Sequence, residues 1–199
     1  EYKNLIKGLV VTGPNQLWVS DITYIDIEGD SDYLHLVTDA YSHKIIGWCL
    51  ADSLSAKHTL EALRMAIRQT GKDNLNGLIH HSDRGIQYCC NAYVEELELH
   101  HISISMTEDY KPTDNAIAER VNGIIKQELI YRRKRFASHE EAYEAIERFI
   151  TFYNDSRPHM SIDYQTPSVA HQQVGTQQRH WKGYQERCQQ NQYNICQSI

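Results

Sequence analysis

The sequence of 199 residues lacks several features that each define a class of protein. It has no apolar run close to the ~18 residues of a membrane-spanning helix. Its first five residues lack the basic-then-apolar pattern of a signal peptide, and internal repeats are missing. Hydrophobic residues make up 41% and charged residues 23% of the chain, which excludes disordered and collagen-like proteins. We therefore expect a globular chain without membrane attachment, long enough for one domain with its own core.

Cysteine is scarce and follows no metal-binding pattern. There are five, an odd number, and none forms a Cys-x-x-Cys pair: Cys49, Cys89, Cys90, Cys188 and Cys196. This argues against a disulfide framework or a zinc knuckle and favours the reducing cytoplasm. The chain also lacks an initiating Met, which indicates a fragment or a processed product.

Histidine occurs in two adjacent pairs, His80-His81 and His100-His101. Adjacent residues on a strand point to opposite faces of the sheet, so neither pair can chelate a metal as a unit. The pairs therefore disfavour a zinc hydrolase.

An excess of positive charge is missing as well. The 20 Lys and Arg residues face 26 Asp and Glu, for a formal net charge of −6, whereas a simple nucleic-acid-binding protein is normally cationic. The charge is uneven, however: residues 1–110 carry 8 basic and 16 acidic side chains, and residues 111–199 carry 12 and 10. Within residues 120–135, six basic side chains face a single acid, Glu128. The net charge thus conceals a basic segment and does not exclude nucleic acid.

The order of the predicted elements indicates an α/β fold. β-Branched and aromatic residues over 17–28, 33–40 and 44–51 predict three antiparallel strands joined by short turns. Helices and strands then alternate, with strands near 77–81 and 102–106 and helices near 55–71, 91–99, 114–131 and from 138 onward. The sequence thus predicts a five-stranded mixed sheet, three antiparallel strands then two more, with helices on both faces.

Two aspartates lie where this fold would place chemistry. Asp21 is in the middle of the first strand, where both faces look largely buried, and a buried carboxylate is costly unless a cation or hydrogen bonds compensate it. Asp83 follows the strand 78–82, at a sheet edge where ligands commonly bind. Taken singly, each has an ordinary alternative: a hydrogen-bonded structural carboxylate for Asp21 and a turn residue for Asp83.

A third acid, Glu119, lies on a predicted helix. At about 100° per residue, the aliphatic side chains of this helix form one stripe and the polar ones lie on the other face. The stripe comprises Ile117, Val121 and Ile124, and the polar face comprises Asn115, Glu119, Asn122 and Lys126. A solvated amphipathic helix is the alternative.

The spacing and surroundings of the three acids resemble those of a known family. Sixty-one residues separate Asp21 from Asp83 and 35 separate Asp83 from Glu119, which resembles the DDE pattern of retroviral-type integrases and transposases. The blocks that carry the resemblance are Asn15–Tyr24, Asp39–Trp48, His80–Tyr88, Asp114–Arg120, Phe152–Asn154, Arg157–His159 and Tyr164–Pro167. Together, over about residues 15–171, they resemble the catalytic core of bacterial insertion-sequence transposases.

This resemblance implies a ribonuclease-H-like fold and a Mg²⁺-dependent polynucleotidyl transferase that cleaves and transfers DNA strands in transposition. By resemblance, Asp21 would bridge two Mg²⁺ ions, Asp83 would hold one and Glu119 the other, and Mn²⁺ could substitute. Hard Mg²⁺ prefers carboxylate oxygens, and two such ions suit an in-line displacement at phosphorus. The implied partners are transposon ends, target DNA and further copies of the chain assembled on DNA in the bacterial nucleoid.

Further side chains are expected to contact DNA. Lys126 lies two turns after Glu119, and the basic run 132–135 is typical of a phosphate contact, although such a run can equally be a solvated turn. The full expected set is Lys126, Asn122, Asn115, Gln87, Tyr88, Arg132, Arg133 and Arg135. We interpret Asp39 as structural and expect Asp26 to point away from Asp21.

The chain is expected to comprise a lead-in (1–14), the catalytic core (15–171) and a Gln-rich extension (172–199), where nine of 28 residues are Gln. Transposases of this kind carry an N-terminal helix-turn-helix region, so the chain resembles a core separated from that DNA-binding part. Two alternatives remain: a nuclease of this fold that cuts without joining, and a binding remnant without catalysis. The block from Asp83 to Tyr88 favours the transposase, and the presence of all three acids disfavours the remnant.

Overall fold

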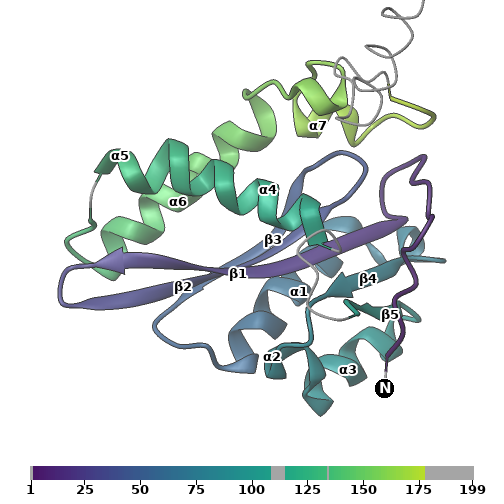
Figure 1. The fold of residues 1–199 in the computed structure, drawn as a ribbon, viewed down its shortest axis with the longest axis horizontal. Helices are drawn as coiled ribbons and strands as arrows, with labels where there is room; N and C mark the ends of the chain where they lie inside the picture. Colours follow the sequence, from purple (N-terminus) through teal and green to yellow (C-terminus); the bar gives the residue numbers. More distant parts are fainter. Residues whose placement is uncertain (1, 109–114, 134, 178–199) are drawn as a thin grey trace, which may run out of the picture.

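The computed structural model describes residues 2–108, 115–133 and 135–177 (Figure 1). Its centre is a five-stranded sheet in the order β3-β2-β1-β4-β5. The strands are β1 (Leu17–Ile27), β2 (Asp30–Asp39), β3 (Ile45–Ala51), β4 (Ile79–Ser82) and β5 (Ser103–Met106). β1, β2 and β3 pair antiparallel, and β4 and β5 continue the sheet in parallel with β1. The predicted mixed sheet is thus confirmed, and β1 is its central strand.

Helices cover both faces of the sheet, as predicted. Figure 1 shows one group below the strands and another above them. The lower group is α1 (Ala56–Thr70), α2 (Ile86–Cys89) and α3 (Asn91–Leu99); the upper group is α4 (Ala116–Ile125), α5 (Tyr131–Arg133) and α6 (His139–Asp155). The short α7 (Pro167–Ala170) packs against α6.

The alternation of side chains along β1 explains this arrangement. Ile25 and Ile27 pack in a core with α4 and α6, whereas Trp18 packs in a second core with α1 and α3. Because successive residues of a strand point to opposite faces, β1 contributes to both cores. The C-terminal half of β1 is less covered on one face, where Tyr24 is 58% exposed.

Local signals set the helix ends and the close packing of α1. Ser138 caps α6, where its hydroxyl accepts a hydrogen bond from the Glu141 backbone N–H at 3.2 Å. On β3, a Cβ built on Gly47 would lie 2.2 Å from the Ala62 carbonyl oxygen. Only glycine therefore lets α1 approach β3 this closely.

The helix that carries Glu119 differs from its prediction in two ways. α4 ends at Ile125, and a π-helical turn (Lys126–Ile130) joins it to α5 instead of a regular helix to residue 131. Its buried face also runs through Ala118 and Ile125, while Ile117 is only half-buried. The π-helical turn changes the helical phase only from Lys126 onward. Within α4 itself the buried face is wider than the predicted stripe, because the helix packs against both β1 and the core.

Several expectations fall on residues 1, 109–114, 134 and 178–199, which lie outside the described residues. They are the helix start at Thr113 or Asp114, the side chain of Lys134, two of the cysteines and most of the Gln-rich extension. Within the described ranges, no helix combines the length and apolar character needed to cross a membrane.

Candidate active site

Parallel pairing of β1 with β4 brings the first two acids together. Val19 is opposite His81 in this pair, so extending the register by two residues places Asp21 beside Asp83. Neighbouring strands lie about 4.8 Å apart, and Asp83 follows the last residue of β4. Asp21 is partly buried, whereas Asp83 is exposed at the end of its strand.

A tight turn holds Asp83 in place. The Gly85 backbone N–H donates to Asp83 Oδ1 at 2.9 Å, and the guanidinium Nε of Arg84 donates to the Thr107 carbonyl oxygen at 2.8 Å. A Cβ on Gly85 would lie 2.9 Å from both Asp83 Oδ1 and Gln87 Oε1. Any larger residue here would displace these two side-chain oxygens, and the Gly85 N–H orients the Asp83 carboxylate.

α4 crosses β1 next to Asp21 and contributes the third acid. The side-chain amide of Asn115 donates to the Ser20 carbonyl oxygen at 3.1 Å, and that of Asn122 donates to Asp21 Oδ2 at 2.6 Å. Glu119 lies in the first turn of α4, three residues before Asn122, and is exposed. β1, the end of β4 and α4 thus each supply one carboxylate to a shared region.

The charges of these acids interact. The pKa of Asp21 is raised from its ordinary 3.8 to about 6, mainly because burial disfavours the charged form, and the charges of Asp83 and Glu119 raise it further. Hydrogen bonds from the Ile22 backbone N–H (2.9 Å, to Oδ1) and from Asn122 oppose this rise. A cation among the three acids would relieve the repulsion.

The donor set of these acids suits a hard divalent ion, because it offers only carboxylate oxygens. The arrangement is open: among the described residues, the one group of three whose ligand atoms all lie within 4.8 Å of one another is Cys49, His58 and Glu61. The three acids are spaced more widely, and an ion at this site would draw them together.

The expected exposed face of α4 is partly wrong. Asn115 and Asn122 are 7% and 6% exposed, because their amides hydrogen-bond to β1, and only Glu119 and, in part, Lys126 reach solvent. A helical projection treats asparagine as an outward polar residue and does not register these partners.

Tyr88 is likewise in the core, at 2% exposure, although it was expected near DNA. Its ring packs against Tyr93, with centroids 5.5 Å apart, and its hydroxyl has no hydrogen-bond partner within the described part of the chain. Burial, followed by the charges of Tyr93, Asp21 and Asp83, raises its pKa well above the usual range. The neighbouring Gln87 is half-exposed.

The basic side chains lie farther along the helical run. Arg132, Arg133 and Arg135 are exposed, and Arg133 pairs with Glu141 at 3.2 Å. Arg132 lies 13 positions after Glu119, or about 20 Å along a helix. Figure 1 shows α5 at the end of this run, away from β4. The structure therefore does not bring these arginines together with the acids.

Asp39 has the structural role that we predicted. It is fully buried and accepts hydrogen bonds from the Asn15 backbone N–H at 2.7 Å and from the Ser42 backbone N–H and hydroxyl at 2.8 Å each. Asp26 is exposed on the other face of β1 from Asp21. His80 on β4 hydrogen-bonds to Ser20 and Tyr93, and its neighbour His81 to Ser105. The second pair, His100-His101, lies between α3 and β5 and not on a strand as the prediction assumed.

Sequence reasoning missed a cationic cavity beside α4. The cavity has a volume of about 720 Å³, and its lining includes His43, Ile117, Arg120, Arg157, His159 and Tyr164. Burial lowers the pKa of His43 and His159 to about 4, so Arg120 and Arg157 carry its positive charge. The Arg157 guanidinium also makes a two-pronged ion pair with Glu128, at 2.8 and 2.5 Å. These residues come from separate segments, but four of the sequence blocks named above contribute to the lining: Asp39–Trp48, Asp114–Arg120, Arg157–His159 and Tyr164–Pro167.

The chain is similar to known proteins over most of its length. In Mycobacterium tuberculosis, a protein of the insertion sequence element IS986/IS6110 is 37% identical over 147 residues, which cover 72% of this chain and 53% of that protein. The transposase for insertion sequence element IS904 of Lactococcus lactis is 34% identical over 167 residues, 82% of this chain and 64% of the relative. The chain thus spans about half to two thirds of the length of these relatives.

A solved structure supports the fold. The HTLV-2 integrase catalytic core domain in complex with magnesium, in its trimeric form, superposes with a TM-score of 0.62 at 20% identity, covering 81% of this chain and 99% of that one. At this identity the likeness establishes the ribonuclease-H-like fold alone.

Family models give the assignment. Two models described as integrase core domain match the chain, one over residues 11–112 and one over residues 100–167. The first match alone spans half of the sequence and includes Asp21 and Asp83; the second includes Glu119. The chain therefore belongs to the integrase core domain family.

Proposed function

We propose that this chain is the catalytic core of an insertion-sequence transposase, a polynucleotidyl transferase that cleaves DNA strands and joins transposon ends to target DNA. The observation that carries the proposal is the convergence of Asp21, Asp83 and Glu119 from β1, β4 and α4, close enough for their charges to interact. Membership of the integrase core domain family supports it.

The acids are proposed to hold Mg²⁺, with Mn²⁺ as a substitute. An all-oxygen set fits such ions, and the related HTLV-2 core is described in complex with magnesium. Asp21, Asp83 and Glu119 would together hold two such ions. When bound, such ions supply Lewis acidity that activates the attacking oxygen and stabilises the leaving oxygen.

Hydrogen bonds from surrounding residues orient the Asp21 and Asp83 carboxylates before an ion binds. Asn122 and the Ile22 N–H fix the two oxygens of Asp21, and the Gly85 N–H fixes one oxygen of Asp83. Little reorganisation then remains when substrate and ions arrive. We propose that Asn115, Asn122 and Tyr88 act chiefly as positioning residues, because all three are buried.

DNA contacts are proposed for the exposed and half-exposed members of the expected set. Lys126 and Gln87 flank the acids, and Arg132, Arg133 and Arg135 would bind phosphates farther along the duplex. The partners are transposon ends, target DNA and further copies of the chain, and the site of action is the nucleoid in the bacterial cytoplasm. Residues 15–171 would form the catalytic core, with end recognition supplied by another part of the transposase.

A strand-joining assay tests the proposal. Pre-nicked end DNA is incubated with target DNA and Mg²⁺ or Mn²⁺, comparing the wild-type chain, Asp83→Asn and the matched control Asp26→Asn. We expect joining by the wild type and the control, and a loss of about 10²-fold or more in Asp83→Asn. Equal joining by all three proteins would overturn the assigned role, and cutting without joining would favour a nuclease.

A further inference from the structure

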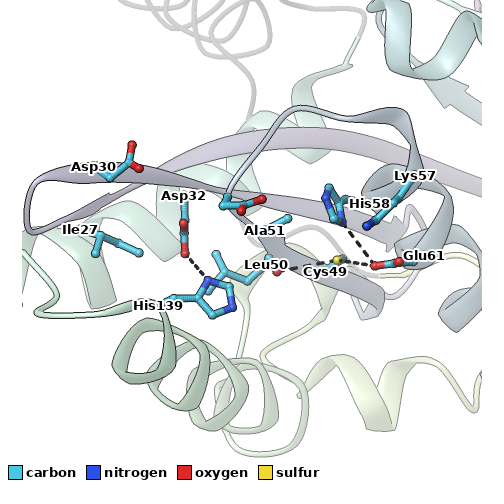
Figure 2. Close-up of a pocket in the computed structure, with 11 residues that line it drawn as sticks. Ile27, Asp30, Asp32, Cys49, Leu50, Ala51, Lys57, His58, Glu61 and His139 are labelled. Atoms are coloured by element: carbon cyan, nitrogen blue, oxygen red, sulfur yellow. Dashed lines mark hydrogen bonds and ion pairs between the residues drawn. The ribbon is translucent and has the colours of Figure 1, made fainter.

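A second cluster of metal-ligating side chains lies on the opposite face of the sheet from α4. It lines one end of a cavity of about 620 Å³ beside β3 and the start of α1 (Figure 2). Cys49 on β3 is opposite His35 on β2, which is opposite Ile22 on β1. The cluster is thus two strands, or roughly 10 Å, away from β1, and separate from the three acids.

Three different ligand types meet here. A ligand atom from each of Cys49, His58 and Glu61 lies within 4.8 Å of the other two. The Cys49 thiol donates to Glu61 Oε2 at 3.3 Å, and His58 Nδ1 lies 3.5 Å from the same oxygen. Figure 2 shows the thiol and the imidazole pointing toward the Glu61 carboxylate.

The fold accounts for this meeting. His58 and Glu61 are three residues apart on α1 and therefore share one helix face. Cys49 faces them from the edge strand, and the close approach of α1 to β3 at Gly47 brings the two elements within ligand distance. The three residues are not spaced as in a familiar zinc motif. Their ligand atoms meet only because α1 packs closely on β3.

The chemistry of the set selects the ion. A thiolate, an imidazole and a carboxylate suit Zn²⁺, which binds such donors in tetrahedral geometry and can leave a fourth position open. Mg²⁺ disfavours sulfur and nitrogen. The rest of the cavity lining is also acidic, with Asp30, Asp32 and Asp52 against Lys57, which favours a cation.

We propose that Cys49, His58 and Glu61 form a Zn²⁺ site that links edge strand β3 to α1. The inference is independent of the strand-transfer function. In the metal-free protein the thiol carries a proton that it donates to Glu61. Zn²⁺ binding releases this proton to the buffer and forms a Zn–S bond, with no change in oxidation state.

The test measures binding of Zn²⁺ alone and of Co²⁺ as a spectroscopic probe. The chain carries Cys188→Ser and Cys196→Ser, so that the C-terminal thiols cannot contribute. In the Asp21→Asn background, where the three-acid site is disabled, we expect one equivalent of Zn²⁺, a heat of binding that depends on the ionisation enthalpy of the buffer, and a thiolate-to-cobalt charge-transfer band. Zn²⁺ should also raise the Tm by several degrees.

Matched variants separate this site from others. Cys49→Ser should abolish the cobalt band and weaken Zn²⁺ binding at least tenfold, and Glu61→Gln, at an exposed position, should weaken it without affecting the fold. Cys89→Ser, at an exposed free thiol, should leave both readouts unchanged. No stoichiometric Zn²⁺ binding, or binding that survives Cys49→Ser and Glu61→Gln, would overturn the proposal.

Discussion

Asp21 and Asp39 are two shielded aspartates on paired strands, and their surroundings differ in kind. Asp39 accepts three hydrogen bonds from N–H and O–H groups and is fully buried. Asp21 accepts two, keeps some exposure and lies within reach of the charges of two other acids. A buried carboxylate whose oxygens all accept hydrogen bonds stabilises the fold. A carboxylate that other negative charges repel is instead suited to bind a cation.

Among substitutions that test this comparison, we expect the largest change in the free energy of unfolding at Asp39. Asp39→Ala leaves the Asn15 N–H and the buried Ser42 N–H without their acceptor, and the Ser42 hydroxyl keeps only His171 as a partner. We expect the free energy of unfolding to fall by about 2–4 kcal/mol, measured by urea unfolding. A loss below about 0.5 kcal/mol would contradict the structural role.

In the absence of metal, Asp21→Asn should instead increase the free energy of unfolding. The folded-state pKa of Asp21, about 6, lies above its ordinary 3.8, so ionisation above pH 6 destabilises the folded wild type. The contribution of Asp21 to stability is therefore present at low pH and lost as the pH rises through about 6. We expect Asp21→Asn to be more stable than the wild type by about 1–3 kcal/mol at pH 7.5 and nearly equal to it at pH 4.

Unfolding of both proteins in EDTA, at several pH values, provides the measurement. Added Mn²⁺ should stabilise the wild type and leave Asp21→Asn unchanged. A variant that is less stable than the wild type at pH 7.5 would show that Asp21 resembles Asp39 after all.

The smallest effect concerns the hydrogen bond from Asn122. Asn122→Ala removes a donor from Asp21 Oδ2 and raises the pKa of Asp21 further. We expect strand joining to fall about tenfold at pH 7, with part of the loss recovered at pH 8.5. Asn115→Ala is the control, since its amide bonds the Ser20 carbonyl oxygen. An equal, pH-independent loss in both variants would indicate a merely structural role.

Much of this molecule could be predicted from local sequence patterns, because strand alternation and capping residues act over a few positions. The five strands and the capping of α6 by Ser138 belong to this part. The inward direction of Asn115 and Asn122 could not be predicted, because it depends on polar partners on another element. The contact between Cys49 and Glu61 could not be predicted either, because it requires α1 to pack on Gly47.

The parallel register of β1 and β4 also bears on how the gene can change. The 61 residues between Asp21 and Asp83 include β2, β3, α1 and the connections between them, and added length in those connections costs little loop entropy. One residue inserted within β1 before Asp21 would instead turn that side chain to the opposite face of the sheet. Insertions should therefore accumulate in the connections between the two acids and be purged within the strands and within a few residues of either acid.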